Sequence, residues 1–386
     1  MKIKTITCHH VYNYGASLQA YALQHYLETL GHEVEIIDFN PWFHCDRYNP
    51  FWMPKNAIGR AASIIKKFPL LRYLWCPYKA YRGGMFNTWG RKAAFDAFEK
   101  KYYHLTPIKY FSSEELKQNP PMADAYIAGS DQIWNTFSNN GKEPGYYLDF
   151  GNDQTKRFSY AASLATNSIK DECKDFIKEK LAKFSSISVR EKTGASLLAD
   201  LGISNVSVVL DPVFLLDKSE WKQLSLKGNL YGLSHESYVL VYDFLGNDDN
   251  MISFVKAYAK EKSLKIVSIN DFSERGYADI NINNAGPLEF LSLIDNAACV
   301  VASSFHATAF SVILEKEFYT FNLKGHNNSS RMLDFLSTIG LQDRMNSEDI
   351  IDNPIDWKKI SSNLLLKLKQ SKDFFNQIGN GACTLL

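Results

Sequence analysis

Four loops of the chain carry side chains that can bind an anion or move a proton; they span residues 13–19, 129–135, 190–191 and 303–307. His306 titrates near neutral pH and can donate or accept a proton. Arg190 offers a planar fork of N–H donors that matches a carboxylate or a phosphate. Ser303 and Ser304 precede His306 at the expected start of a helix, where free N–H groups and the helix dipole attract an anion. These residues predict a site for an acidic, phosphorylated substrate, with acid–base chemistry and no metal.

The same residues also have structural interpretations. Polar residues and glycine at loop–helix junctions make turns and caps, which is the alternative for Asn13, Gly15, Ser130 and Asp131. Trp134 is more often packed in a core than stacked on a sugar. Arg190 can form a weak local ion pair with Glu191, and a lone histidine such as His306 is often structural. The residue types alone leave these alternatives open.

The elements that must position these loops follow an α/β pattern. In the first half, strands are expected at 2–8, 34–39, 125–128, 157–161, 187–189 and 206–210. In the second half, they are expected at 238–244, 264–269, 279–282, 299–302 and 318–323. Helices such as 15–30 join them into βαβ units, so we expect two doubly wound, Rossmann-like domains with parallel sheets that face a cleft. Ligands in such folds bind at the carboxyl ends of strands, where the four loops lie.

The domain organisation follows from these two series. We expect an N-terminal domain over 1–212, a C-terminal domain over 213–350, and a helix over 351–386 that packs back on the N-terminal domain. A basic, aromatic helical insertion is expected at about 41–120. Its segment from Arg47 to Lys109 has 13 Lys and Arg against two acids, a net charge of +11. This segment either packs on the first domain with its lysines in solvent or docks on an anionic membrane.

Composition and missing motifs exclude several function classes. The chain has 386 residues, 45% of them hydrophobic, and a net charge of +1, which disfavours disorder and a globally basic nucleic-acid binder. It has no GxGxxG, P-loop, HExxH or GxSxG motif. The six cysteines form no CxxC pair, and no apolar run approaches the ~18 residues that span a bilayer. We therefore expect a cytoplasmic protein with reduced thiols.

Six segments together resemble the polysaccharide pyruvyl transferase family: NYGASLQAYAL (13–23), GSDQIWN (129–135), SYAAS (159–163), SVRE (188–191), LDP (210–212) and SFHATAFS (304–311). They occur in the family's order over about residues 5–345. The resemblance implies a glycosyltransferase-B-like fold. It implies transfer of a pyruvyl group from phosphoenolpyruvate to hydroxyls of a sugar in a surface polysaccharide or its lipid-linked precursor. A cyclic pyruvate ketal forms and phosphate leaves, and no cofactor is implied beyond phosphoenolpyruvate as donor substrate.

The resemblance also implies roles for particular residues. His306 is the expected acid–base group and Arg190 the donor ligand, and both are expected to be catalytic. Some relatives place an arginine where this chain has Ser304, so Arg331 and His326 are the cations expected in its stead. The donor side is expected in the C-terminal domain (213–350), with Arg190 reaching from the N-terminal one, and comprises Arg190, Ser303, Ser304, His306, Ala307, His326 and Arg331. The acceptor side is expected in the N-terminal domain (1–212) and comprises Asn13, Tyr14, Gly15, Ser130, Asp131, Gln132 and Trp134.

The expected partners follow from this chemistry. They are phosphoenolpyruvate, a sugar or lipid-linked oligosaccharide acceptor, and an anionic surface at the inner face of the membrane that segment 47–109 contacts. No nucleic acid is expected. Two other functions stay open: a nucleotide-sugar glycosyltransferase of the same fold, and a catalytically silent glycan-binding protein.

Overall fold

A computed structural model describes residues 1–44, 48, 69–82, 89–244, 246, 248–270, 273–323 and 330–379. The strands are β1 (Lys2–Ile6), β2 (Glu33–Phe39), β3 (Leu105–Tyr110), β4 (Ala125–Ala128), β5 (Lys156–Ser159), β6 (Ile187–Val189), β7 (Val206–Val208), β8 (Tyr238–Tyr242), β9 (Lys265–Ile269), β10 (Ile280–Ile282), β11 (Cys299–Ala302) and β12 (Glu317–Thr320). The helices are α1 (Tyr14–Thr29), α3 (Arg72–Arg82), α4 (Trp89–Tyr102), α5 (Ser113–Gln118), α6 (Asp171–Leu181), α7 (Lys192–Asp200), α8 (Lys218–Ser225), α9 (Asp249–Lys262), α10 (Pro287–Asn296), α11 (Phe305–Ile313), α12 (Ser330–Ile339), α13 (Trp357–Asp373) and α14 (Asn376–Gly379). Short 3-10 turns include η1 (Pro69–Leu71) and η5 (Pro212–Phe214).

Two parallel sheets of five strands have the same winding. The N-terminal sheet has the order β3-β2-β1-β4-β5, and the C-terminal sheet has the order β10-β9-β8-β11-β12. The parallel pair β6–β7 lies beyond β5, because single bridges join Phe158 to Ser186 and Ala162 to Val189. The winding direction reverses between β1 and β4, and again between β8 and β11. These reversals are the places where open α/β sheets bind ligands. The α/β prediction is therefore confirmed.

The central strands and the helix after β1 show why the sequence folds this way. All residues of β4 (AYIA) and β11 (CVVA) are buried, as expected for strands covered on both faces. α1 begins where the Asn13 side chain accepts a hydrogen bond from the Ala16 N–H, which caps the helix. Leu18, Leu23 and Leu27 recur at helical spacing and are fully buried. A helix with one such face has to pack against a neighbour.

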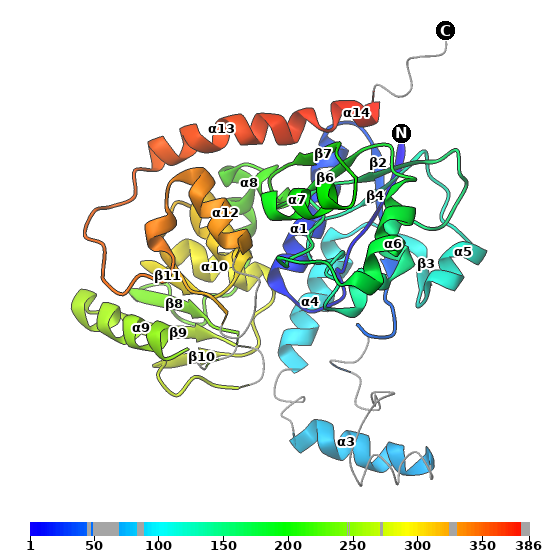
Figure 1. Ribbon diagram of the computed structural model, residues 1–386. Helices are drawn as coiled ribbons and strands as arrows, with labels where there is room; N and C mark the ends of the chain where they lie inside the picture. Colours follow the sequence, from blue (N-terminus) through cyan, green and yellow to red (C-terminus); the bar gives the residue numbers. More distant parts are fainter. Residues whose placement is uncertain are drawn as a thin grey trace.

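That neighbour is the other domain, because α1 lies between the two sheets (Figure 1). The Tyr14 ring on α1 stacks on the Phe290 ring on α10, with centroids 4.6 Å apart. Across the same boundary, Trp221 on α8 contacts Tyr21 on α1 edge to face. One continuous cluster of buried apolar residues includes members of both sheets. The two halves therefore share a core, which sets the position of one set of loops relative to the other.

The C-terminal helices lie across both domains. Figure 1 shows α13 (red) running from the side of the second sheet to the first. The Phe375 ring stacks on Tyr160 with centroids 4.6 Å apart and contacts Tyr26 at 5.1 Å, and both partners belong to the first domain. The Ser371 hydroxyl accepts a hydrogen bond from the Leu210 N–H. The sequence predicts one helix over 351–386, whereas the structure has two, α13 and α14. The break between them is at 374–375, where both phenylalanine rings are buried in the core.

The predicted insertion at 41–120 is smaller than expected. β3 is the edge strand of the N-terminal sheet, and α4 contributes Phe95 and Phe98 to the shared core, so these elements belong to the domain itself. α3 stands apart from both sheets in Figure 1. Most of segment 45–68 and residues 83–88 lie outside the described residues. In the part of the chain that the structure describes, no helix combines the length and apolar character that crossing a bilayer requires.

We expect Phe375→Ala to lower the free energy of unfolding by about 3 kcal/mol, because a buried ring is lost from the contact with the first domain. Leu366→Ala on the same pair of helices is the matched control, since Leu366 is 62% exposed, and it should change stability by less than about 0.5 kcal/mol. Urea denaturation measures both. Equal effects of the two changes would contradict the packing described for the C-terminal helices.

Candidate functional site

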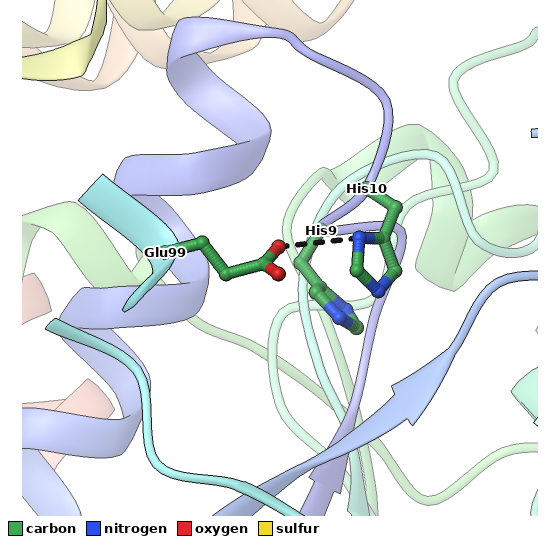
Figure 2. Close-up of side chains that lie close together, drawn as sticks. All are labelled: His9, His10 and Glu99. Atoms are coloured by element: carbon green, nitrogen blue, oxygen red, sulfur yellow. Dashed lines mark ion pairs between the residues drawn. The ribbon is translucent and has the colours of Figure 1, made fainter. Parts of the chain in front are cut away.

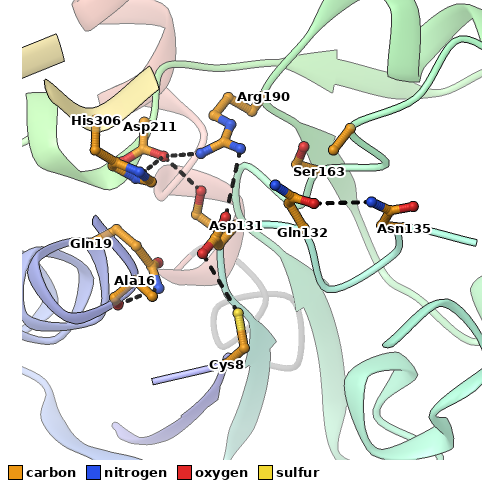
Figure 3. Close-up of polar contacts among 12 residues, drawn as sticks. Cys8, Ala16, Gln19, Asp131, Gln132, Asn135, Ser163, Arg190, Asp211 and His306 are labelled. Atoms are coloured by element: carbon orange, nitrogen blue, oxygen red, sulfur yellow. Dashed lines mark hydrogen bonds and ion pairs between the residues drawn. The ribbon is translucent and has the colours of Figure 1, made fainter. Parts of the chain in front are cut away.

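Four loops converge on the carboxylate of Asp211, which follows β7 and is completely buried (Figure 3). Its Oδ2 accepts hydrogen bonds from Arg190 Nη1 at 2.6 Å and from the Ser130 hydroxyl at 2.9 Å. The same oxygen lies 3.4 Å from Nε2 of His306. Oδ1 accepts a hydrogen bond from the Val213 N–H, so both carboxylate oxygens are engaged. The loops after β4, β6, β7 and β11 thus meet at one negative charge.

The electrostatics of this cluster keep Asp211 ionised. Burial alone would raise the pKa of its carboxyl, but the charges of His306 and Arg190 and their hydrogen bonds outweigh burial and hold that pKa well below its usual value. Burial opposes the charge of Arg190 as well, yet Asp211 and the nearby Glu191 and Asp131 give the guanidinium a raised pKa. A buried, ionised carboxylate therefore balances the charge of the Arg190 guanidinium and lies beside the His306 imidazole.

His306 is fixed from two sides. It lies in the first turn of α11, which begins where the Ser304 hydroxyl accepts a hydrogen bond from the Ala307 N–H. Asp211 stands beside Nε2, and the backbone of Gly15 lies against the other side of the ring. A Cβ at position 15 would come within 2.0 Å of Nδ1, so only glycine leaves room for the imidazole here. Gly15 is therefore needed for a close approach between the two domains.

A second buried cation, Arg331 on α12, lines the same pocket as Arg190, Asp211 and Phe305. Its Nε is buried and makes no hydrogen bond within the described chain. Burial and the like charge of Arg190 lower the pKa of the Arg331 guanidinium to about 10. Arg190 also has buried Nε and Nη2 atoms without a hydrogen-bond partner among the described residues, although Glu191 and Asp131 stand 3.9 and 4.0 Å away. Two guanidinium groups with unused donors form a site that suits a small anion.

The residues predicted on the acceptor side border this cluster. Asp131 adopts a positive φ of 70°, and its carboxylate accepts a hydrogen bond from the Cys8 thiol at 3.6 Å. Gln132 follows it and is partly exposed, with Oε1 accepting a hydrogen bond from the Asn135 amide (Figure 3). Ser130 is bound to Asp211, and Asn13 caps α1. The structure thus brings Ser130 and Asp131 next to Arg190.

Three residues predicted as ligands turn out to be packed instead. Trp134 is 1% exposed, its ring is stacked on Tyr147, and its Nε1–H donates to a backbone carbonyl, so no face is free for a sugar. Tyr14 is fully buried between the domains, and its hydroxyl donates to the Ala285 carbonyl. Ala307 is also fully buried, with its N–H committed to the helix cap. Aromatic rings at the start of a loop or helix are drawn into the core because burial of a large ring is strongly favourable.

Three donor-side predictions remain: Ser303, Ser304 and His326. Ser303 and Ser304 both serve the backbone: the Ser303 hydroxyl accepts a hydrogen bond from the Phe244 N–H, and Ser304 caps α11. Their role as donor ligands stays a prediction. His326 lies outside the described residues.

Sequence reasoning missed Asp211 as a member of the site. The sequence analysis includes Asp211 only in the LDP segment of the family resemblance and assigns it no role. The available signal was its place directly after a strand, at the same sheet edge as Arg190. Two buried partners on other loops, Ser130 and His306, are brought to it only by the fold.

Comparisons with known proteins agree with this architecture. The UDP-GlcNAc 2-epimerase from Neisseria meningitidis matches with a TM-score of 0.51 at 10% identity, over 98% of this chain and 100% of that one. The UDP-GlcNAc 2-epimerase from Methanocaldococcus jannaschii matches with a TM-score of 0.50 at 12% identity, over the same shares. At such identities the likeness concerns the fold alone, and it confirms the expected glycosyltransferase-B-like architecture. A search among curated proteins found no match.

A family comparison is more specific. The family described as polysaccharide pyruvyl transferase matches residues 13–325 of the 386. The match includes Gly15, Arg190, Asp211 and His306, the residues that meet between the two sheets. The chain belongs to the polysaccharide pyruvyl transferase family.

Proposed function

We propose that this chain transfers a pyruvyl group from phosphoenolpyruvate to two hydroxyls of one sugar in a surface polysaccharide or its lipid-linked precursor. One observation carries the proposal: the buried guanidinium groups of Arg190 and Arg331 both have N–H donors without a hydrogen-bond partner in the described chain, and they line one pocket with Asp211, whose carboxylate lies 3.4 Å from Nε2 of His306. Family membership supports a pyruvyl transferase with a polysaccharide acceptor. The donor and the ketal product are the parts that the proposal adds.

The donor fits the charges of the pocket. Phosphoenolpyruvate carries a carboxylate and a phosphate, and each needs a cationic or N–H-rich partner. Arg331 supplies a cation whose charge is repelled by Arg190, so an anion placed between the two guanidinium groups relieves that repulsion. Arg190 is already neutralised in part by Asp211 and offers its remaining N–H groups. In the proposed complex, one guanidinium binds each anionic group of the donor.

The proton steps fit His306. The Asp211 carboxylate lies 3.4 Å from Nε2, and the Gly15 backbone lies against the Nδ1 side of the ring. In the proposed reaction the His306 imidazole delivers a proton to C3 of the donor while a sugar oxygen bonds to C2. A second hydroxyl of the same sugar then displaces phosphate from C2 and closes the ring. The first hydroxyl loses the proton that balances the one gained at C3, and the proton of the second hydroxyl leaves with phosphate.

The function is tested by supplying phosphoenolpyruvate and a panel of glycans and measuring both phosphate release and the mass gain of a pyruvate ketal. His306→Gln should lower turnover by about 10²–10⁴-fold, because the proton-transferring group is lost. His104→Gln is the control, since His104 is a surface histidine paired with Glu28. Near-normal turnover in His306→Gln would contradict the role of the imidazole.

The same experiment separates the alternatives. Binding of UDP without any response to phosphoenolpyruvate would favour a nucleotide-sugar enzyme, and a matched neighbour was solved with UDP-GlcNAc bound. Glycan binding with no turnover would favour a silent binding protein.

Arg331 and Arg344 form a matched pair for a second test, since both are buried arginines of the second domain. We expect Arg331→Gln to raise KM for phosphoenolpyruvate at least tenfold without loss of stability, because it removes a buried charge that lacks a hydrogen-bonded partner in the described chain. Arg344 forms an ion pair with Glu317. We expect Arg344→Gln to lower the free energy of unfolding by about 3 kcal/mol and to leave KM unchanged. The reverse pattern would contradict donor binding by Arg331.

We further propose that η1 and α3 dock on an anionic membrane surface and so bring the enzyme to a lipid-linked acceptor. Six large apolar side chains there are exposed, and the four most exposed are Leu70 (80%), Leu74 (75%), Tyr81 (70%) and Tyr78 (61%). The surrounding segment 47–109 has a net charge of +11, which complements acidic headgroups. An apolar face within a basic segment is typical of an interfacial helix.

Co-sedimentation with phosphatidylserine vesicles measures this docking. We expect binding at low salt, weaker binding at high salt because basic residues are screened, and loss of binding in the double variant Leu70→Ser/Leu74→Ser. Leu226→Ser is the control, because Leu226 is 84% exposed at the C-terminal end of α8, which lies apart from α3 in Figure 1. Equal sedimentation of the double variant, or none of the native chain at low salt, would contradict the docking surface.

A further inference from the structure

Three side chains outside the site described above gather close enough to hold a metal ion. They are His9 and His10, in the loop after β1, and Glu99 on α4 (Figure 2). One potential ligand atom from each lies within 4.8 Å of the others. The proposed pyruvyl transfer uses none of them. The question is whether their other contacts leave those atoms available.

His9 leaves one nitrogen without a partner. Its Nδ1 lies 3.1 Å from the backbone carbonyl of Thr7, so the Nδ1–H donates there and the lone pair resides on Nε2. The residue is 3% exposed, and Nε2 is buried with no hydrogen-bond partner in the described chain. A buried polar atom of this kind calls for an explanation, and an ion is one of the accepted ones. A fixed tautomer with a free Nε2 is the form in which histidine binds metals.

Both ring nitrogens of His10 lie close to carboxylates. Its Nε2 lies 2.6 Å from Asp38 Oδ1, and its Nδ1 lies 3.2 Å from Glu99 Oε2. A ligating histidine commonly donates its other ring N–H to a carboxylate, which orients the ring. Asp38 occupies that orienting position. Nδ1 then faces the Glu99 carboxylate, the third potential ligand.

A proton is the competing occupant of this place. Burial would lower the pKa of His10, but its hydrogen bonds to Asp38 and Glu99 raise it, so a proton on Nδ1 competes with an ion for the place between His10 and Glu99. The protonated state satisfies His10 and Glu99 but leaves Nε2 of His9 unpaired. An ion bound by all three residues pairs every one of these atoms.

We propose that His9, His10 and Glu99 bind a divalent transition-metal ion of the zinc type, with the Thr7 carbonyl and Asp38 orienting the two imidazoles. Two imidazoles and one carboxylate suit Zn²⁺ and its neighbours rather than Mg²⁺ or Ca²⁺, which prefer oxygen ligands. Three protein ligands leave one coordination position open. Tyr12 and Asp96 line the adjoining pocket together with His10 and Glu99, so that position is accessible to water or a ligand.

The test uses the full chain after treatment with a chelator, titrated with Zn²⁺ in a calorimeter. We expect one Zn²⁺ per chain and no comparable binding of Mg²⁺. His9→Phe, which keeps a buried ring but removes the nitrogen, should weaken binding at least 100-fold, and Asp38→Asn should weaken it 10- to 100-fold. The control is His104→Phe, which removes a histidine of the same domain that lies outside the cluster and should leave the affinity unchanged.

Two further measurements keep the outcome decisive. Glu99 is partly exposed, so Glu99→Gln should fold normally and still lose most of the affinity, whatever the effect of His9→Phe on folding. The absorption spectrum of bound Co²⁺ should report nitrogen and oxygen ligands and should change in Glu99→Gln. Absence of stoichiometric Zn²⁺ binding, or unchanged affinity in both variants, would overturn the proposal. Neither readout depends on phosphoenolpyruvate, so the result stands apart from the proposed function.

Discussion

The buried carboxylate of Asp211 is the interaction on which the rest of the site depends. It is the only group that contacts Ser130, Arg190 and His306 together, and these residues come from three other loops of the described chain. Without this charge, Arg190 would be a buried cation with only distant acidic neighbours, at 3.9 and 4.0 Å. An ion pair of this kind contributes little net stability, because desolvation offsets most of the attraction. Its main effect is to fix the positions of Ser130, Arg190 and His306 relative to one another, because all three approach the same oxygen, Oδ2 of Asp211.

Arg331 differs from Arg190 because no acidic side chain is hydrogen-bonded to it in the described chain. Arg190 and Arg344 both have close acidic partners, whereas Arg331 lies in the same pocket as Arg190 and has no hydrogen bond there. A folded chain keeps such a group only where something offsets its cost, and the anionic donor proposed above would do so. The pocket is therefore electrostatically incomplete in the described chain, and the proposed donor carries the charge that completes it.

Much of the architecture could be predicted from the sequence, because strand periodicity and the order of elements are local properties. The buried strands β4 and β11 were placed to the residue, and the loops after them were located correctly. Predictions failed where packing decided the outcome. Trp134 and Tyr14 stand in polar loops or next to them, yet their rings are taken into cores formed by residues far away in the sequence. Asp211 was missed for the same reason, since its partners lie on three other loops.

The contact between Gly15 and His306 links chemistry to the arrangement of the whole molecule. The imidazole lies on α11 of the C-terminal domain, while both groups that confine it, the Gly15 backbone and the Asp211 carboxylate, belong to the N-terminal domain. A rotation of one domain against the other would therefore separate the ring from both groups without altering any single residue, and the proposed proton transfer would lose its geometry. The contacts of Ser371 and Phe375 with the N-terminal domain oppose such a rotation, so the C-terminal helices contribute to the integrity of a site that they do not touch.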